Sequence, residues 1–405
     1  MDYDGSLRWL GTLPDFERTG AFAGRHDLAT MRTLLAELGD PHVDADRATV
    51  HIAGSKGKGS TAVMIEAILR ASGGVIGTYV SPHLHRYNER IRIDGAPIGE
   101  HEFAAAMTTV RIAMERVAPS LGDAEFVAFD ALTAAAFVAF REAKVDAQVV
   151  EVGLGGTYDP TNVLDASPHT VVITPISLEH TAILGATIPE IAAQKAGIVT
   201  RGDVVVVAPQ RESALDVIHS VATERGARVI EVAQACHLNR TAASGEAQDF
   251  KLQTPDATYA ARLPLLGRHQ LDNAATAVVA CEEVQRRFGA TLPPDAVREG
   301  LAAVAWPGRM EVLKRSPLVV VDGAHNGDSA KRMVAALKEH FGVSQATFVF
   351  GTLAGKDVEA MAIAAAPAAR EVYVTAWPSE RAMDPREAAE PFRRQGAPVT
   401  VFGDA

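Results

Sequence analysis

The residues most suggestive of chemistry lie in a glycine-rich segment, 54–61, that reads G-S-K-G-K-G-S-T and follows an apolar run. Its glycines allow tight turns, so that backbone N–H groups can face phosphate oxygens. Lys58 would reach the outer phosphates of a nucleotide, and Ser60 or Thr61 would offer a hydroxyl to Mg²⁺. A plain glycine-rich β–α turn is the alternative, because an extra glycine breaks the G-x-x-x-x-G-K-[ST] pattern. We predict phosphate binding through Gly54, Gly57, Lys58, Gly59, Ser60 and Thr61.

Two further apolar runs end in polar residues that suit a metal ion. Glu151 closes the run A-Q-V-V-E and is costly to bury unless it is paired or holds a cation. His180 follows the run that ends at Thr174. Ligands of open α/β sheets lie at the carboxyl ends of the strands. Glu151, His180 and Ser60 are therefore predicted to converge on one Mg²⁺ ion held partly by phosphate oxygens. A hydrogen-bonded loop histidine is the alternative for His180.

Other polar residues are further candidates for the site. Lys195, within the apolar segment 191–198, is either a surface lysine whose stem lies along apolar neighbours or a lysine turned toward the anionic site. Asn273 would read an adenine edge, hold a phosphate or cap a helix. Arg309 would place a guanidinium on phosphate oxygens. Asp322 and His325, after another apolar run, would add a second polar wall to a cleft.

Segment 81–95 reads as a long polar loop with three arginines. A solvated loop is one interpretation. The other is a mobile loop beside an anionic substrate, with Ser81, His83 and Arg90 as candidate contacts.

These residues need strands and helices to hold them. Alternating apolar runs and amphipathic stretches predict βαβ units on a mostly parallel sheet. The sequence predicts an α/β fold with a small antiparallel insert over 249–263. The predicted helices are 60–71 and 130–144. The predicted strands are 49–53, 147–152, 170–174, 204–208, 318–321, 347–350, 372–375 and 398–402. Pro307 and Gly308 mark a boundary. We expect a large domain over 1–306 and a smaller α/β domain over 307–405, which is short for a doubly wound domain and is expected to be truncated.

Composition narrows the class of protein. The chain has 405 residues and a formal net charge of −11, which argues against a protein that coats nucleic acid. Two cysteines are too few for disulfide bonds to stabilise a fold of this size. There is no apolar leader and no run long enough for a membrane span. We therefore expect a cytoplasmic protein with small-molecule partners.

Several ordered motifs together resemble the folylpolyglutamate synthase / dihydrofolate synthase family of the Mur-ligase superfamily. The resemblance runs from about Tyr3 to Ala382. The motifs are the 54–60 loop, S-P-H-L (81–84), E-R-I (89–91), Glu151 with G-L-G-G (153–156), Asp159 with T-N (161–162), His180, K-A-G-I (195–198), H-Q (269–270) with Asn273, P-G-R (307–309) with Glu311, and D-G-A-H-N (322–326).

The resemblance implies a Mur-ligase-like fold and an ATP-dependent amide ligase that acts as a monomer. L-glutamate would be joined to dihydropteroate or tetrahydrofolate (poly)glutamates through an acyl phosphate. Lys58 would be the phosphate-loop lysine, and Ser60, Glu151 and His180 the magnesium ligands. Lys195 would be carbamylated and support a second Mg²⁺. The implied ATP contacts are Asn273, Arg309, Asp322 and His325, and the implied substrate contacts are Ser81, His83, Arg90, Phe129, Asp130 and Asp159.

Some positions depart from the family pattern, and two other functions compete. Thr157 stands where the family has arginine, which bears on the choice of acceptor. A related Mur-type ligase that joins an amino acid to another carboxylate is the first alternative. The second is a nucleotide-binding regulatory protein that has lost catalysis. It would need decay at positions such as Lys58 or Glu151, and neither is missing.

Overall fold

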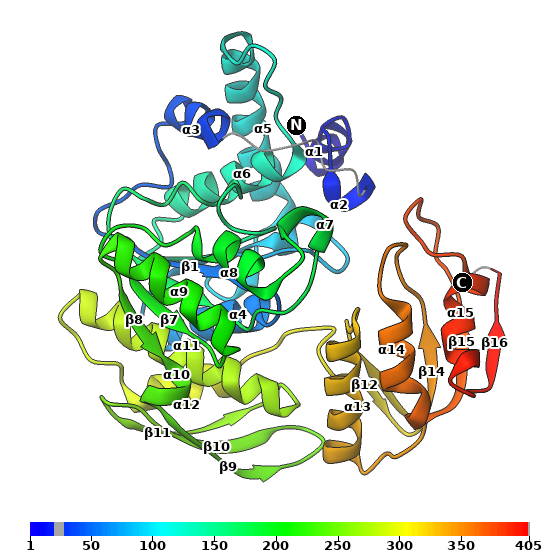
Figure 1. The fold of residues 1–405 in the computed structure, drawn as a ribbon. Helices are drawn as coiled ribbons and strands as arrows, with labels where there is room; N and C mark the ends of the chain where they lie inside the picture. Colours follow the sequence, from blue (N-terminus) through cyan, green and yellow to red (C-terminus); the bar gives the residue numbers. More distant parts are fainter. Residues whose placement is uncertain (20–27, 404–405) are drawn as a thin grey trace.

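An eight-stranded sheet organises the larger part of the protein in the computed structural model, which describes residues 1–19 and 28–403 (Figure 1). Across the sheet the order is β4 (Ala96–Pro97), β3 (Ile91–Ile93), β2 (Ile76–Tyr79), β5 (Ala147–Glu151), β1 (Ala48–Ala53), β6 (Thr170–Ile173), β7 (Val204–Val207) and β8 (Arg228–Glu231). The six strands from β2 to β8 in this order are parallel, and β3 and β4 run antiparallel at one edge. The central strands are buried, which explains why they read as continuous apolar runs.

Helices cover both faces of this sheet (Figure 1). One face packs against α4 (Lys58–Ala71) and α11 (Arg268–Arg287), with α12 (Pro294–Ala302) behind them. The other face has two apolar clusters. The first contains α1 (Tyr3–Leu10), α3 (Leu28–Glu37), α5 (Glu100–Val117) and α6 (Ala128–Glu142), and the second α7 (Thr181–Leu184), α8 (Ile188–Ala196) and α9 (Glu212–Arg225).

The antiparallel insert, predicted over 249–263, begins earlier than expected, because it is a separate three-stranded sheet of β9 (His237–Ala243), β10 (Gln248–Gln253) and β11 (Thr258–Leu263). Alternate residues such as Phe250, Leu252 and Tyr259 are buried against the core of the first face. Short α-helices in the described residues also include α2 (Phe16–Thr19) and α10 (Val232–Ala235), and 3₁₀ helices span Tyr87–Arg90, Ala118–Ser120 and Ala366–Ala368.

A separate, smaller α/β domain forms the C-terminal part (orange to red in Figure 1). Its parallel sheet has the order β14 (Ala346–Phe350), β15 (Ala369–Val374) and β16 (Val399–Val401), and an antiparallel pair, β12 (Glu311–Arg315) and β13 (Leu318–Val321), precedes it. The helices are α13 (Gly327–Phe341), α14 (Val358–Ala365) and α15 (Pro385–Arg394). Met361, Val372 and Phe392 lie in a core of its own.

The predicted fold class and the predicted strands are confirmed, with ends that differ by up to three residues. The two predicted helices begin two residues earlier than expected, at Lys58 and Ala128. The prediction that 81–95 is one long loop is wrong in its second half, where Ile91–Ile93 pairs with β2 and continues the sheet. Ile91 and Ile93 alternate with Arg92, but three residues are too few to identify a strand without the neighbour they pair with.

No helix in residues 1–19 or 28–403 is both long and apolar enough to cross a membrane.

Helices α12 and α4 pack closely at Gly300. A Cβ atom added there would lie 2.6 Å from the backbone oxygen of Ala67 and 2.7 Å from the Cα of Ile68. Because these are backbone atoms of the helix that begins in the glycine-rich segment, they can move only if α4 moves.

Gly300→Ala should therefore lower the free energy of unfolding by about 1–3 kcal/mol, the usual cost of overpacking, despite the better helix propensity of alanine. Urea unfolding followed by circular dichroism measures the change. Glu299→Ala, on the exposed side of the same helix, is the control and should stay within about 0.5 kcal/mol of the parent. Equal stability of the Gly300 variant and the parent would contradict the close packing.

Candidate active site

A cleft of about 1210 Å³ lies between the large domain and the C-terminal domain. The carboxyl ends of β1, β5 and β6 open into it, as expected for an open parallel sheet. Seventeen of the predicted site residues line it: Gly54, Gly57, Lys58, Gly59, Ser60, Ser81, His83, Arg90, Phe129, Glu151, Asp159, His180, Lys195, Asn273, Arg309, Asp322 and His325. Thr61 and Asp130 do not. The Thr61 hydroxyl is buried without a partner among the described residues. Asp130 accepts the backbone N–H of Val127 within the first turn of α6.

The glycine-rich segment forms the turn between β1 and α4. Gly54 and Gly57 have φ angles of 145° and 88°. Both also lie against neighbours: a Cβ on Gly54 would fall 1.9 Å from Oγ1 of Thr174, and one on Gly57 would fall 2.6 Å from Oδ1 of Asn273. No side chain caps the N-terminus of α4. Its first N–H groups and the positive end of the helix are therefore available to an anion in the cleft.

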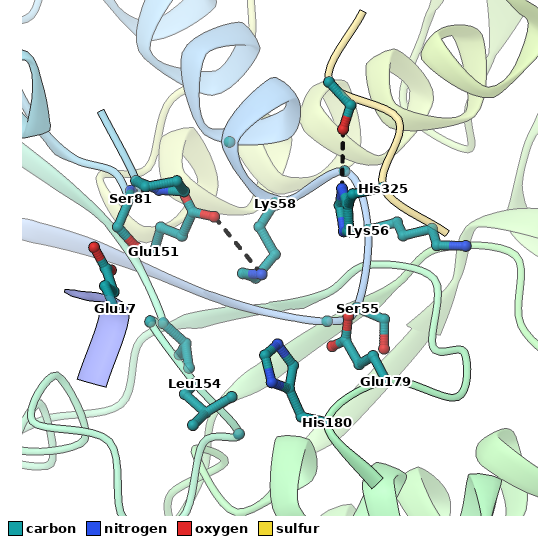
Figure 2. Close-up of a pocket in the computed structure, with 18 of the residues that line it drawn as sticks. Glu17, Ser55, Lys56, Lys58, Ser81, Glu151, Leu154, Glu179, His180 and His325 are labelled. Carbon is teal, nitrogen blue, oxygen red and sulfur yellow. Dashed lines mark hydrogen bonds and ion pairs between the residues drawn. The ribbon is translucent and has the colours of Figure 1, made fainter. Parts of the chain in front are cut away.

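Lys58 and Glu151 face each other at the centre of the cleft. Figure 2 shows the Lys58 side chain reaching toward Glu151, with His180 on the opposite side. Nζ of Lys58 lies 3.7 Å from Oε1 of Glu151, and the backbone N–H of Ser81 donates to Oε2 at 3.2 Å. Burial raises the pKa of Glu151, and Lys58 opposes that shift. The contact is too long for a strong hydrogen bond, so both charges remain available to a ligand.

A second buried pair lies behind the first. Lys195, 2 % exposed, donates from Nζ to Glu179 at 2.8 Å and to the backbone oxygen of Gly54 at 2.8 Å. Burial lowers the pKa of Lys195 and Glu179 opposes the shift. Burial works against ionisation of Glu179, but Lys195 and Lys58 hold its pKa below the usual value. The sequence had not predicted Glu179 as a site residue. Its position next to His180 was the available signal.

A magnesium ion would depend on the nucleotide at this site. In residues 1–19 and 28–403, no three His, Cys, Asp or Glu side chains converge on one point. Ser60 and Glu151 nevertheless offer oxygen atoms beside the phosphate loop, and burial lowers the pKa of His180, which favours a neutral ring. Mg²⁺ is usually held by one or two protein oxygens together with substrate phosphates. The donor set therefore fits an ion that arrives with a nucleotide.

Arg90 and Glu17 lie together in the lining of the cleft. The Arg90 side chain is almost fully buried, pairs with the carboxylate of Glu17 and donates from Nε to Nδ1 of His83 at 2.9 Å. Because His83 accepts that bond, its Nδ1 carries no proton. Glu17 was missed by sequence reasoning, because α2 is only four residues long and lies far from any recognised motif.

The C-terminal domain supplies the opposite wall. Asp322 accepts the N–H of Met310 at 2.9 Å, and Nδ1 of His325 is 2.9 Å from the backbone oxygen of Gly323. Contacts between the domains at this wall include Lys56 to Asp328 at 2.6 Å and Arg381 to the backbone oxygen of Glu17 at 2.5 Å. Away from the cleft, the N–H of Gly267 donates to Nε2 of His340 at 3.0 Å. This wall also contains residues that the sequence had not predicted for the site, among them Lys356, Trp377 and Arg381.

Two protein-family models match this chain and define the class of protein to which it belongs. A family model for the Mur ligase middle domain matches residues 52–281, and one for the Mur ligase, glutamate ligase domain matches residues 308–405. The chain thus has the two domains of a Mur-type ligase.

Individual relatives then narrow the family. Folylpolyglutamate synthase of Lacticaseibacillus casei is 35% identical over 93% of this chain and 86% of its own length. Dihydrofolate synthase/folylpolyglutamate synthase of Bacillus subtilis is 36% identical over 84% of this chain and 78% of its own. The Mycobacterium tuberculosis folylpolyglutamate synthase structure complexed with ADP and AMPPCP superposes with a TM-score of 0.90 at 35% identity, covering 100% of this chain and 90% of that one. The chain belongs to the folylpolyglutamate synthase / dihydrofolate synthase family.

His269, at the start of α11 in the cleft, gives a pH-dependent prediction. Burial foremost, with Arg332 and Arg309 nearby, lowers the pKa of His269 to about 4. The unfolded chain protonates this histidine near pH 6.5. Between these values the unfolded state binds a proton that the folded state does not, so the free energy of unfolding falls as pH falls.

His269→Gln should therefore reduce the loss of stability between pH 6.5 and pH 5 by up to about 1.4 kcal/mol per pH unit relative to the parent. Urea unfolding at several pH values measures both slopes. His237→Gln, at an exposed position on β9, controls for the loss of a histidine. Identical slopes in the parent and the His269 variant would contradict the assignment.

Proposed function

We propose that this chain is an ATP-dependent ligase that joins L-glutamate to dihydropteroate, to tetrahydrofolate (poly)glutamates, or to both. The observation that supports it best is the cleft itself. One continuous space joins a phosphate loop, a buried carboxylate–ammonium pair, an arginine-bearing acceptor end and polar residues of a glutamate ligase domain. We also propose that the protein acts as a monomer.

The reaction that fits this site has two chemical steps. A carboxylate oxygen of the pteroate or folate attacks the γ-phosphorus of ATP, and the bond to the β,γ-bridging oxygen breaks, giving an acyl phosphate and ADP. The amino group of L-glutamate then attacks the acyl carbon. Phosphate leaves, the amine loses a proton, and an amide forms. Little covalent chemistry falls to the protein, so its part is positioning and charge neutralisation.

We assign the nucleotide to the phosphate loop and to the C-terminal wall. Lys58 and the N-terminus of α4 would face the transferred phosphoryl group, where negative charge spreads in the transition state. Asn273, Arg309, Asp322 and His325 would contact the rest of ATP. The contact between Lys56 and Asp328 would hold the C-terminal domain closed over the loop and exclude water from the acyl phosphate.

We assign the acceptor to the end of the cleft formed by Ser81, His83, Arg90, Phe129 and Asp159. Phe129 offers a ring for stacking, and it lies 5.8 Å from the ring of Tyr79. Asp130 and Thr61, which do not line the cleft, would act only through the helices that contain them.

Mg²⁺ would be held by Ser60, Glu151 and His180 together with phosphate oxygens. When bound, it neutralises the charge that develops on the transferred phosphoryl group. The Lys58 ammonium group then moves from Glu151 to the phosphates. Because Nζ of Lys58 lies as far as 3.7 Å from Oε1 of Glu151, breaking this ion pair costs little free energy.

Carbamylation of Lys195, with a second Mg²⁺, is a finer proposal. The arrangement in this structure does not accommodate a carbamate as it stands. A carboxylate added to Nζ would lie against Glu179 and the Gly54 carbonyl, both of which repel it. We therefore propose that Lys195 is an unmodified amine in the nucleotide-free protein and can be carbamylated only when a cation separates it from Glu179.

The first experiment measures ADP release with Mg-ATP and L-glutamate, with dihydropteroate, tetrahydrofolate or no acceptor in parallel. Glutamate-dependent ADP release with one or both pterins is expected. Release with neither, in a protein that still binds ATP, would overturn the folate assignment and favour a Mur-type ligase for another carboxylate.

Lys58→Ala and Glu151→Ala should each lower kcat at least 100-fold, because each removes a charge from the transferred phosphoryl group or its metal ion. The melting temperature should stay within a few degrees of the parent. Lys251→Ala, an exposed change on β10, should leave turnover unchanged. Near-normal turnover in either active-site variant would remove that residue from the mechanism.

The state of Lys195 is measured by ¹³C NMR in ¹³C-bicarbonate. We expect a carbamate resonance only when Mg²⁺ and an ATP analogue are both present, and no such resonance in Lys195→Arg. A resonance in the nucleotide-free, metal-free protein would contradict the proposed ion pair with Glu179.

A further inference from the structure

We propose that His51 and Thr161 are positioning residues that fix the acceptor-side loop, residues 152–162, to the strand that ends in the phosphate loop. The inference rests on the proposed function, because it concerns the loop assigned to the acceptor. His51 belongs to β1, three residues before Gly54, and its side chain is fully buried outside the cleft lining. It therefore acts on the substrate only through other residues.

The first link is the loop itself, which Asp159 closes. Oδ2 of Asp159 accepts the backbone N–H of Leu154 at 2.8 Å. Oδ1 accepts the backbone N–H of Thr161 at 3.1 Å and its hydroxyl at 2.6 Å. Both carboxylate oxygens are thus occupied by the loop. Leu154 and Asp159 line the cleft, and Figure 2 shows Leu154 beside His180. The carboxylate determines the shape of the wall that the acceptor meets.

The second link joins that loop to β1. The Thr161 hydroxyl has one proton, and a carboxylate can only accept it. The hydroxyl oxygen must then accept the bond from Nε2 of His51, which lies 2.9 Å away. His51 is therefore the Nε2–H tautomer, and its Nδ1 is buried with no partner among the described residues. The hydrogen bonds run in one direction, from His51 through Thr161 to Asp159.

The surroundings of His51 keep its ring neutral and in place. Burial, with His169 as a second cause, lowers its pKa well below the usual value. The ring of His169 lies 6.0 Å away, and Nδ1 of His169 lies 3.3 Å from Oδ1 of Asp203. Strand pairing fixes the backbone of His51, which is paired with Val150 of β5 and Val171 of β6. The Nε2–H group of His51, the first donor of the hydrogen-bond chain, is therefore held in place toward Thr161.

The chain of hydrogen bonds from His51 to Asp159 matters for the reaction because it connects the phosphate loop to the acceptor wall. Gly54, at the end of β1, belongs to the phosphate loop, and Leu154 and Asp159 belong to the acceptor wall. A rigid link between them sets the distance from the acceptor carboxylate to the γ-phosphate. In-line transfer is sensitive to that distance, and a shift of about 1 Å costs on the order of 100-fold in rate.

Thr161→Val tests the link by removing the hydroxyl at nearly constant volume. We expect the KM for the pterin acceptor to rise at least tenfold and kcat to fall, while the dissociation constant of an ATP analogue stays within twofold. Thr161→Ser keeps the hydroxyl and should restore the acceptor KM to within about threefold of the parent. The donor is tested with two variants of His51. His51→Gln, whose side-chain amide can still donate a hydrogen bond, should retain more affinity for the acceptor than His51→Leu.

Thr254→Val is the matched control for buried hydroxyl loss. The Thr254 hydroxyl donates to a buried carboxylate, Glu282, at the same 2.6 Å, and neither residue lines the cleft. This variant should lose stability without any change in acceptor KM. Hydrogen–deuterium exchange gives a readout that needs no acceptor: peptides covering 152–162 should exchange faster in Thr161→Val and should not in Thr254→Val.

Three outcomes would overturn the inference: an unchanged acceptor KM in Thr161→Val, a Thr161→Ser variant no better than Thr161→Val, or unchanged exchange over 152–162. If Thr161→Val does not fold, the serine variant and the two His51 variants still give the comparison. Failure of the proposed function is distinguished from these outcomes, because it would appear in the parent protein as no turnover with either pterin.

Discussion

The site depends on one constraint of the sheet, the parallel alignment of β5, β1 and β6. Because parallel strands end at the same edge, Glu151, Gly54 and the segment leading to His180 meet there although they are distant in sequence. β1 pairs with β5 on one side and β6 on the other, and the register places Glu151 opposite Ile52. Three parts of the cleft wall are attached to this edge: the phosphate loop follows β1, Glu151 ends β5, and Glu179 lies beyond β6.

Burying so many charges at one edge requires that each be matched. Two ammonium groups, Lys58 and Lys195, lie among two carboxylates, Glu151 and Glu179. Each carboxylate would be costly in an apolar environment alone. The two pairs differ in tightness, 3.7 Å for Lys58–Glu151 and 2.8 Å for Lys195–Glu179. The loose pair leaves both charges open to a ligand, whereas Lys195 of the tight pair also donates to the carbonyl of Gly54 and so holds the loop.

The two-domain arrangement follows from what the chemistry needs. A phosphate loop on the large domain can hold ATP, but water must be kept from a reactive acyl phosphate. The C-terminal domain contributes Asp322, His325 and Lys356 to the cleft and contacts the large domain through Lys56–Asp328 and Arg381–Glu17. These polar contacts can break and re-form, while elsewhere the domains are joined by an apolar cluster of Leu266, Met310 and Ala336 and by the N–H of Gly267, which donates to Nε2 of His340.

The sequence by itself determined the fold class, most of the strands and the members of the site whose type and local motif are informative. Buried parallel strands leave continuous apolar runs, and a glycine-rich turn before a helix is readable from residues 54–61 alone. Glu17, Glu179, the β3 strand and the His51–Thr161–Asp159 chain were decided only by the tertiary structure. Their roles come from partners far away in sequence, Arg90, Lys195, β2 and the acceptor loop. A hydrogen bond or ion pair between distant residues leaves no periodic or local pattern for a single sequence to reveal.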